Sequence, residues 1–261
     1  MIAQAQENWN PEAYDRFRGF RLRPPVDLLN AISDVPDGDI VDLGCGTGVM
    51  GEILAARFPK HRLVGVDNSP AMLARAYQTK RYSELAEKDI ATWQPNTPTS
   101  LIFSNAALQW VGDHETLMPH LAGLLAASGV LAVQMPHQND APSHRVWDIC
   151  FERVFGSAPD APAPDIMRPE DYFELLSSMG MVQLWETDYF QMLAPSDDGH
   201  PVRLFTESTY ARPMLSRLSE EDRKKLIAAY ENEIEHAYPR RADGSVLFVF
   251  KRLFFILKLR E

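Results

Sequence analysis

The chain has 261 residues, of which 45% are hydrophobic and 24% charged, a composition that suits one enlarged α/β domain or a core with a small cap. Its formal net charge of −10 argues against nucleic acid as a partner, because nucleic-acid binding needs a basic face. The two cysteines, Cys45 and Cys150, provide no disulfide framework, so we expect a cytoplasmic protein in a reducing compartment.

The first 25 residues predict an arm that precedes the fold. They interleave aromatic residues with arginines, namely Trp9, Tyr14, Phe17 and Phe20 with Arg16, Arg18, Arg21 and Arg23. Acidic residues and arginines also interrupt the stretch, so no secretory segment is expected. Pro24 and Pro25 end the arm, and a first core helix is expected from Val26. The arm either lies over the sheet with its arginines in water, or is a lid that brings positive charge to an anionic substrate.

Residues 40–48 predict a buried strand that runs into a glycine loop at the start of a helix. The apolar run 40–43 is short enough for a central parallel strand. Gly44, Gly46 and Gly48 then remove every Cβ from one side of the turn, so a ligand can lie against bare backbone. The free N–H groups of this loop sit at a helix N-terminus, where they can meet an electron-rich ligand.

The acidic residues around the loop indicate which ligand it holds. Residues 46–51 match the dinucleotide pattern, but that pattern should begin directly after the strand, where Gly44 stands. Asp42 precedes the loop, Asp67 ends the next strand and is placed to take both hydroxyls of a ribose, and Asp89 ends a third strand pattern. A pyrophosphate would gain nothing from Asp42, whereas an ammonium and a sulfonium would. The pattern therefore favours S-adenosylmethionine.

Residues 36–136 alternate between strand and helix patterns. Strands are expected at 39–43, 62–67, 84–88, 101–103 and 130–133. Helices are expected at about 48–58, after the N-cap pair Ser69-Pro70, and at 113–126. Such alternation predicts a parallel sheet with ligands at the carboxyl ends of its strands.

The regularity loosens beyond residue 136. Helices are expected at 145–155, 169–179 and 219–237, and strands at 181–190 and 246–258 complete a sheet of seven. The stretches 137–168 and 194–239 exceed ordinary connector length, so we expect them to form a cap over the cofactor edge of a single domain, 1–261. Lysine and arginine interrupt the last apolar run, which is too short to span a bilayer, and no membrane partner is expected.

Several stretches carry a resemblance to known proteins. Asp-Leu-Gly-Cys-Gly-Thr-Gly at 42–48 and Gly-Val-Asp-Asn-Ser-Pro-Ala-Met-Leu at 65–73 resemble class I methyltransferases. Over nearly the whole chain, further stretches are similar to the trans-aconitate 2-methyltransferase family, at 104–111, 129–136, 185–187, 237–239, 243–244 and 252–254. The resemblance implies a Rossmann-like fold with a mostly parallel seven-stranded sheet, helices on both faces and a helical cap. It implies an S-adenosylmethionine-dependent enzyme that forms a monomethyl ester on a carboxylate of a small di- or tricarboxylic acid, trans-aconitate.

The resemblance also implies which residues bind the cofactor and its product S-adenosylhomocysteine. They are Asp42, Gly44, Cys45, Gly46, Gly48, Asp67, Asn68, Met72, Asp89, Ile90 and Asn105. A methionine at helical spacing, such as Met72, is also typical of plain core.

On the substrate side, the chemistry predicts positioning groups alone. A carboxyl group of pKa about 4 is already ionised at neutral pH, so no general base, no catalytic dyad and no metal is expected. A polyanionic acid needs cations and hydrogen-bond donors, and the arm covers the cofactor pocket in the resembled family. The substrate-binding candidates are Tyr14, Arg21, Trp110, His114, Arg212 and Arg252, with Gln109, His144 and Tyr238 beside them.

Other interpretations stay open for these residues and for the chain. Any one arginine can form a surface ion pair instead, and His114 can solvate the first turn of its helix. A malonyl-carrier-protein O-methyltransferase also has Gln-Trp after the fourth strand, although Arg-Leu-Phe at 252–254 favours the small acid. A non-catalytic module that binds S-adenosylmethionine is a third possibility, and the sequence does not indicate the oligomeric state.

Overall fold

The computed structural model describes residues 18–161 and 163–260. The chain divides into two compact units. Among the described residues, the first, the sheet unit, comprises Leu22–Pro136, Asp165–Glu186 and 253–260, and the second, the helical unit, comprises 18–21, 137–161, 163–164 and Thr187–Arg252. Among the described helices, none combines the length and apolar character needed to cross a membrane.

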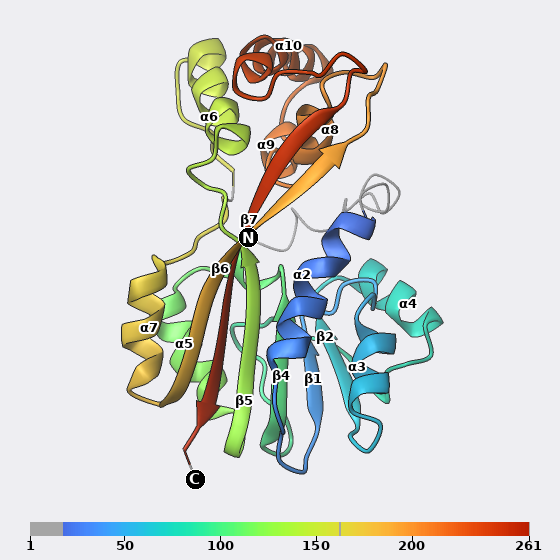
Figure 1. Ribbon diagram of the computed structural model, residues 1–261, viewed down its shortest axis with the longest axis vertical. Coiled ribbons are helices and arrows are strands. Elements are labelled where there is room, and N and C mark those ends of the chain that lie inside the picture. The colour runs from blue at the N-terminus through green and yellow to red at the C-terminus, as the bar shows by residue number, and fades with distance from the viewer. Residues whose placement is uncertain (1–17, 162, 261) are drawn as a thin grey trace. The chain divides into compact units, whose positions relative to one another are not determined.

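One sheet of seven strands runs through the described chain (Figure 1). Its order is β3-β2-β1-β4-β5-β7-β6, with β1 (Ile40–Leu43), β2 (Leu63–Asp67), β3 (Glu84–Glu87), β4 (Thr99–Asn105), β5 (Leu125–Pro136), β6 (Gly180–Leu193) and β7 (Val246–Leu259). The first five strands pair in parallel, which confirms the predicted mostly parallel sheet. The chain turns from one side of β1 to the other at β4, and α/β sheets bind ligands at the carboxyl ends of strands at such a point.

Helices cover both faces of the sheet unit, as predicted. They are α2 (Arg18–Ala31), α3 (Gly51–Arg57), α4 (Pro70–Gln78), the 3-10 turn η2 (Leu108–Trp110), α5 (His114–Gly123) and α7 (Pro169–Ser177). Figure 1 shows α2 in front of β1 and β4, with α5 and α7 side by side on the other face. The latter pair packs on alternate strand residues in a buried cluster that includes Val41, Leu43, Ile102, Leu131, Leu121 and Leu176.

Local sequence accounts for where two of these helices begin. Ser69 caps α4, because its hydroxyl accepts a hydrogen bond from the Met72 N–H at 3.4 Å, and Pro70 takes the first helical position. α3 begins at Gly51 rather than at residue 48 as predicted. The φ angles of +53° at Gly46 and +77° at Gly48 keep the loop backbone out of the helical region.

Two predicted boundaries are wrong for reasons that lie outside the local pattern. α2 contains Pro24 and Pro25, which we expected to precede it, since the fixed φ of proline suits a helix even though each ring removes one intrahelical bond. The helix predicted to reach residue 126 ends at Gly123, and β5 begins at Leu125, which pairs with Thr99 of β4. Tertiary pairing with β4 thus overrides the helical spacing.

The helical unit is built around α6 (Pro142–Phe155) and α10 (Glu220–Ala237), with α8 (Pro201–Glu207) and α9 (Arg212–Leu215) beside them. The ring of Trp147 stacks on Tyr230 at 3.9 Å between centroids, and its indole N–H donates to Thr206 Oγ1 at 2.9 Å. Ser219 caps α10, as predicted, by accepting from the Asp222 N–H. The predicted role of 137–168 and 194–239 as a cap over the cofactor edge stays a prediction.

Candidate functional site

The glycine loop after β1 is anchored to β2 by its own backbone. The N–H groups of Gly44 and Cys45 both donate to Val66 O, at 2.8 and 3.0 Å. A Cβ placed on Gly44 would lie 2.3 Å from Ala107 Cβ, and one on Gly48 would lie 3.0 Å from Ala76 Cα. A Cβ on Gly46 would meet no described atom within 4 Å. The missing Cβ is thus needed for close packing at Gly44 and Gly48, whereas Gly46 faces open space. Contact of the three glycines with a ligand stays a prediction.

Asp67 closes the loop from the end of β2. Its carboxylate accepts hydrogen bonds from the Gly46 N–H at 2.8 Å and from the Ser69 N–H at 2.9 Å. Burial raises the pKa of Asp67, and these two backbone donors oppose the rise. The carboxylate is thus fixed beside the one glycine of the loop that faces open space, and its remaining lone pairs are available to a ligand.

Asp42 is buried within β1, where its carboxylate accepts a hydrogen bond from the Tyr82 hydroxyl at 2.6 Å. Burial raises the pKa of Asp42 to about 7, the hydrogen bond from Tyr82 opposes this rise, and the charge of Asp67 adds to it. A bound cation would favour the ionised form of such a carboxyl group. Burial also raises the pKa of the Cys45 thiol, so Cys45 stays neutral and is no nucleophile.

The contacts of the other predicted cofactor residues do not fix a role toward a ligand. Ile90 lies beside Gly44, with its Cδ1 3.5 Å from where a Cβ on Gly44 would stand. Asp89 is exposed and accepts from the Ala91 N–H at 2.9 Å. Asn68 is exposed and Met72 is partly buried in the first turn of α4. Their roles toward the cofactor stay predictions.

Amide side chains gather at the carboxyl ends of β4 and β5. Asn105 pairs with Gln134 across the two strands, and the next residue, Ala106, takes a φ of +53°. Gln109 donates from Nε2 to Ala106 O at 2.8 Å. Among the described residues, Asn105 Oδ1, Gln109 Oε1 and both amide atoms of Gln134 are buried with no hydrogen-bond partner. Sequence reasoning missed Gln134, for which the only signal was a polar residue inside an apolar strand.

Trp110 and His114 follow these amides on η2 and α5. Trp110 is partly buried, whereas His114 is only 4% exposed. The His114 ring is hydrogen-bonded to two protein groups. Its Nε2 atom lies 2.9 Å from Leu108 O, and its Nδ1 atom contacts the Tyr172 hydroxyl. Burial lowers the pKa of His114, so the ring is neutral. The alternative that His114 merely solvates its helix is wrong, and a substrate contact would require one of these two bonds to be given up.

In the helical unit, the predicted cation Arg252 is buried rather than exposed. It is 3% exposed, and its guanidinium lies 3.8 Å from the centroid of the Phe250 ring. Burial, followed by the charge of Arg252, lowers the pKa of His144 to about 3. The His144 ring lies 4.3 Å from the ring of Tyr210, and Tyr210 donates to Asp148 at 2.7 Å. A surface ion pair is thus excluded as an account of Arg252.

The remaining substrate candidates are less informative. Burial lowers the pKa of Arg212 at the start of α9. Tyr238 follows α10, and its carbonyl oxygen lies 3.0 Å from His200 Nε2, within hydrogen-bond distance. Arg21 lies in α2 with its side chain outside the described residues, and Tyr14 lies outside them altogether. Within residues 18–161 and 163–260, no group of three or more His, Cys, Asp and Glu side chains is arranged to hold a metal ion.

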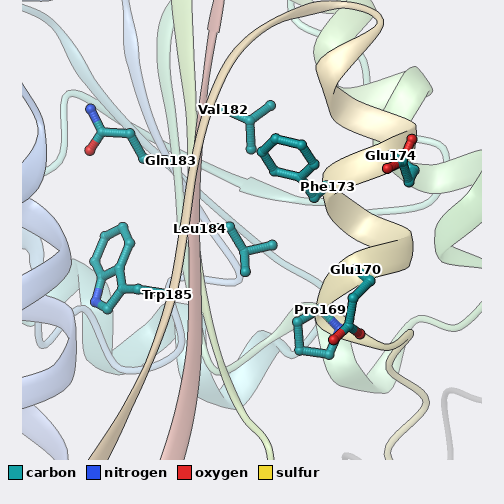
Figure 2. Close-up of a pocket in the computed structure, with 8 residues that line it drawn as sticks. All are labelled: Pro169, Glu170, Phe173, Glu174, Val182, Gln183, Leu184 and Trp185. Carbon is teal, nitrogen blue, oxygen red and sulfur yellow. The ribbon is translucent and has the colours of Figure 1, made fainter.

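A separate groove of about 700 Å³ lies between α7 and β6 (Figure 2). Figure 2 shows Phe173 of α7 facing Val182 and Leu184, while Gln183 and Trp185 point to the other side of β6. Since β6 ends the sheet and three strands separate it from β1, this groove is not part of the glycine-loop site.

The chain is similar in sequence to known methyltransferases. Residues 40–129 match a family model described as a methyltransferase domain. The chain is 38% identical over 252 residues to a trans-aconitate 2-methyltransferase of Klebsiella pneumoniae, covering 96% of this chain and 98% of that protein. It is 40% identical over 255 residues to one of Acidovorax ebreus, covering 95% and 97%.

Solved structures share the fold at low identity. The YcgJ protein of Bacillus subtilis has a TM-score of 0.57 at 14% identity, with 90% of this chain and 97% of that chain covered. Phosphoethanolamine N-methyltransferase 2 of Haemonchus contortus, in complex with S-adenosyl-L-methionine, has a TM-score of 0.57 at 16% identity, with 95% and 56% covered. At this identity the likeness concerns the fold alone.

Proposed function

Because this chain belongs to the trans-aconitate 2-methyltransferase family, we propose that it methylates a carboxylate of trans-aconitate to give a monomethyl ester. The methyl donor is S-adenosylmethionine and the other product is S-adenosylhomocysteine. The observation that carries the proposal is the geometry of the glycine loop, in which the open position of Gly46 is hydrogen-bonded to Asp67, whose charge acts on the buried carboxyl group of Asp42.

The loop residues fit this cofactor on their chemistry. Gly46 leaves room for a ligand against the backbone, and Asp67 presents a fixed carboxylate beside it. Two carboxyl groups would repel a pyrophosphate, whereas they attract a ligand that carries an ammonium and a sulfonium. When bound, the cofactor supplies a methyl group that its sulfonium makes electrophilic.

The reaction asks the protein for alignment rather than for proton transfer. The S–CH₃ bond breaks as an O–CH₃ bond forms, and the acid carries no proton to remove because its carboxyl group is ionised at neutral pH. Holding the reacting atoms about 3 Å apart in line supplies several kcal/mol of the barrier. This accounts for a site in which Cys45 and His114 are buried and neutral.

Recognition of the acid requires cations and hydrogen-bonding groups. We assign Arg252 and Arg212, with Tyr14 and Arg21 of the arm, to the carboxylates, because a guanidinium matches a carboxylate in shape and charge. The buried amide atoms that have no partner among the described residues, which belong to Asn105, Gln109 and Gln134, support an acceptor side at the ends of β4 and β5. The arm 1–25 and the stretches 137–168 and 194–239 are proposed to close over the site and exclude water.

The cysteines and the net charge support a proposal for the cellular location and for the kind of acceptor. Both cysteines are free and buried, which supports a cytoplasmic location. The net charge of −10 supports a small-molecule acceptor rather than nucleic acid or an anionic membrane surface.

A substrate panel tests the proposal. Purified protein is incubated with methyl-labelled S-adenosylmethionine and with trans-aconitate, cis-aconitate, citrate or a malonyl thioester. We expect a base-labile methyl ester on trans-aconitate at the highest kcat/KM. Turnover of the malonyl thioester without turnover of trans-aconitate would assign the chain to carrier-protein methylation instead.

A further inference from the structure

Tyr82 occupies a socket formed by three glycines from separate segments of the sheet unit. A Cβ on Gly51 would lie 2.7–2.9 Å from Cε2, Cζ and Oη of Tyr82, and one on Gly65 would lie 2.9 Å from its Cδ1. A Cβ on Gly48 would lie 3.0 Å from its Cε2. Real Cβ atoms essentially never approach heavy atoms to less than 3.0 Å, so the Tyr82 ring in this position requires glycine at residues 51 and 65 and packs tightly against Gly48.

The same ring carries its hydroxyl to the buried carboxyl group of Asp42. The Tyr82 O–H donates to Asp42 Oδ2 at 2.6 Å across 40 positions of sequence, a length typical of a hydrogen bond between a hydroxyl and a charged carboxylate. Burial and the neighbouring charge of Asp42 raise the pKa of Tyr82, so the hydroxyl keeps its proton and remains the donor. Tyr82 thereby links β1 to the segment that precedes β3.

We propose that Tyr82 is the positioning residue of the cofactor loop. Its ring is fixed in the socket of Gly48, Gly51 and Gly65, and its hydroxyl holds the Asp42 carboxylate ionised and oriented toward the cationic end of the cofactor. The inference rests on the proposed function for the identity of that cofactor.

The groups that face Asp42 determine how binding depends on pH. They are Tyr82, which stabilises the ionised carboxyl group, Asp67 of β2, which opposes ionisation, and the neutral thiol of Cys45. Asp42 has a pKa of about 7 and binds a cation only when ionised, so cofactor affinity falls as the pH drops below this value. Loss of the Tyr82 hydroxyl removes the group that lowers this pKa, and the midpoint moves to higher pH.

The test is calorimetric titration with S-adenosylhomocysteine, which retains the ammonium, from about pH 6 to about pH 8.5. Tyr82→Phe keeps the ring in its socket and removes the hydroxyl. We expect an affinity about ten-fold lower at neutral pH, which recovers toward the wild-type value at the upper end, as the loss of one charge-assisted hydrogen bond implies. Asp42→Asn is expected to bind weakly at every pH without a midpoint.

Two further variants make the result specific. Tyr77→Phe removes the hydroxyl of a tyrosine on α4 that is 71% exposed, and its profile should match the wild type. Gly51→Ala leaves the hydroxyl present but displaces the ring that carries it, and should reproduce the upward shift of the midpoint.

Each outcome is decisive. A Tyr82→Phe profile that coincides with the wild type, or an equal loss of affinity at every pH without a shift, overturns the positioning role. A wild-type protein that does not bind S-adenosylhomocysteine contradicts the proposed function instead.

Discussion

Asn105 and Gln134 lie opposite each other on the neighbouring parallel strands β4 and β5, at the edge where the methyl acceptor is proposed to bind. Gln134 is 0% exposed, yet neither atom of its amide has a hydrogen-bond partner in the described part of the chain. A buried amide in this condition costs about 1–3 kcal/mol of stability, which a folding role alone does not justify.

Gln134→Leu should therefore separate stability from activity. The leucine removes the unsatisfied amide, so the Tm should rise or stay level, whereas kcat/KM for trans-aconitate should fall about ten-fold through loss of one hydrogen bond to the acceptor. Thermal unfolding and initial rates measure both. Gln138→Leu is the control, since Gln138 is also buried, at 4% exposure, but donates to Val249 O at 2.9 Å, and loss of this hydrogen bond should lower the Tm. A destabilised Gln134→Leu protein with normal turnover would show that the residue is structural.

Two substitutions in the glycine loop, Gly44→Ala and Gly46→Ala, should affect stability and cofactor binding in opposite ways. Gly44→Ala places a Cβ 2.3 Å from Ala107, so it should lower the Tm strongly. Gly46→Ala meets open space and should cost only about 1–2 kcal/mol for its positive φ, while its methyl group enters the ligand surface and weakens binding of S-adenosylhomocysteine. Thermal unfolding and calorimetry distinguish the two. Tight binding by a folded Gly46→Ala protein would place the cofactor elsewhere.

Arg252→Met should alter recognition of the acid and leave the cofactor unaffected. Methionine keeps the apolar contact with Phe250 and removes the cation, so KM for trans-aconitate should rise about ten-fold or more, as expected for one lost charge-assisted contact. The affinity for S-adenosylhomocysteine should stay within experimental error. Arg153→Met on α6, where Arg153 forms an exposed ion pair with Glu233, is the control and should change neither quantity. Loss of cofactor binding with an unchanged KM would refute the assignment of Arg252.

His144 predicts a specific loss of stability in acid. Its pKa is about 3 in the folded protein, against about 6.5 for an unperturbed histidine, so the unfolded chain binds a proton first and stability falls as the pH drops below about 6.5. Near pH 4.5 this loss should reach about 2–3 kcal/mol. Denaturant titrations of the wild type and His144→Leu at each pH give the loss as the difference between their free energies of unfolding. Asp42, whose folded pKa is raised, contributes in the opposite direction to both proteins, so its contribution cancels in the difference. Parallel pH profiles for the two proteins would show that His144 does not titrate in this way.

Much of the sheet unit could be predicted because its signals are local. Asp42, Gly46 and Asp67 lie at or just after the ends of strands whose apolar runs are short and clear. The cap of α4 could be predicted from the adjacent residues Ser69 and Pro70. The end of α5 could not be predicted, because it depends on the pairing of Leu125 with β4.

The parts of the site that sequence reasoning missed depend on contacts between distant segments. Nothing local to Tyr82 indicates that its ring fills a socket of three glycines, and the glycines alone do not reveal which side chain they admit. His114 depends on such contacts too, since both of its ring nitrogens contact protein groups that its position after β4 does not indicate, and its role toward the substrate stays a prediction. Arg252 stands out in the sequence because it interrupts an apolar strand, and the structure shows that it is buried, while its role toward the substrate stays a prediction.

The most direct measurement is a single-turnover experiment that follows the methyl label from S-adenosylmethionine in the presence of trans-aconitate. The account predicts that each S-adenosylhomocysteine formed is matched by one label in a base-labile ester of the acid. Formation of a stable complex with S-adenosylhomocysteine, but no label in trans-aconitate at saturating concentration, would contradict it.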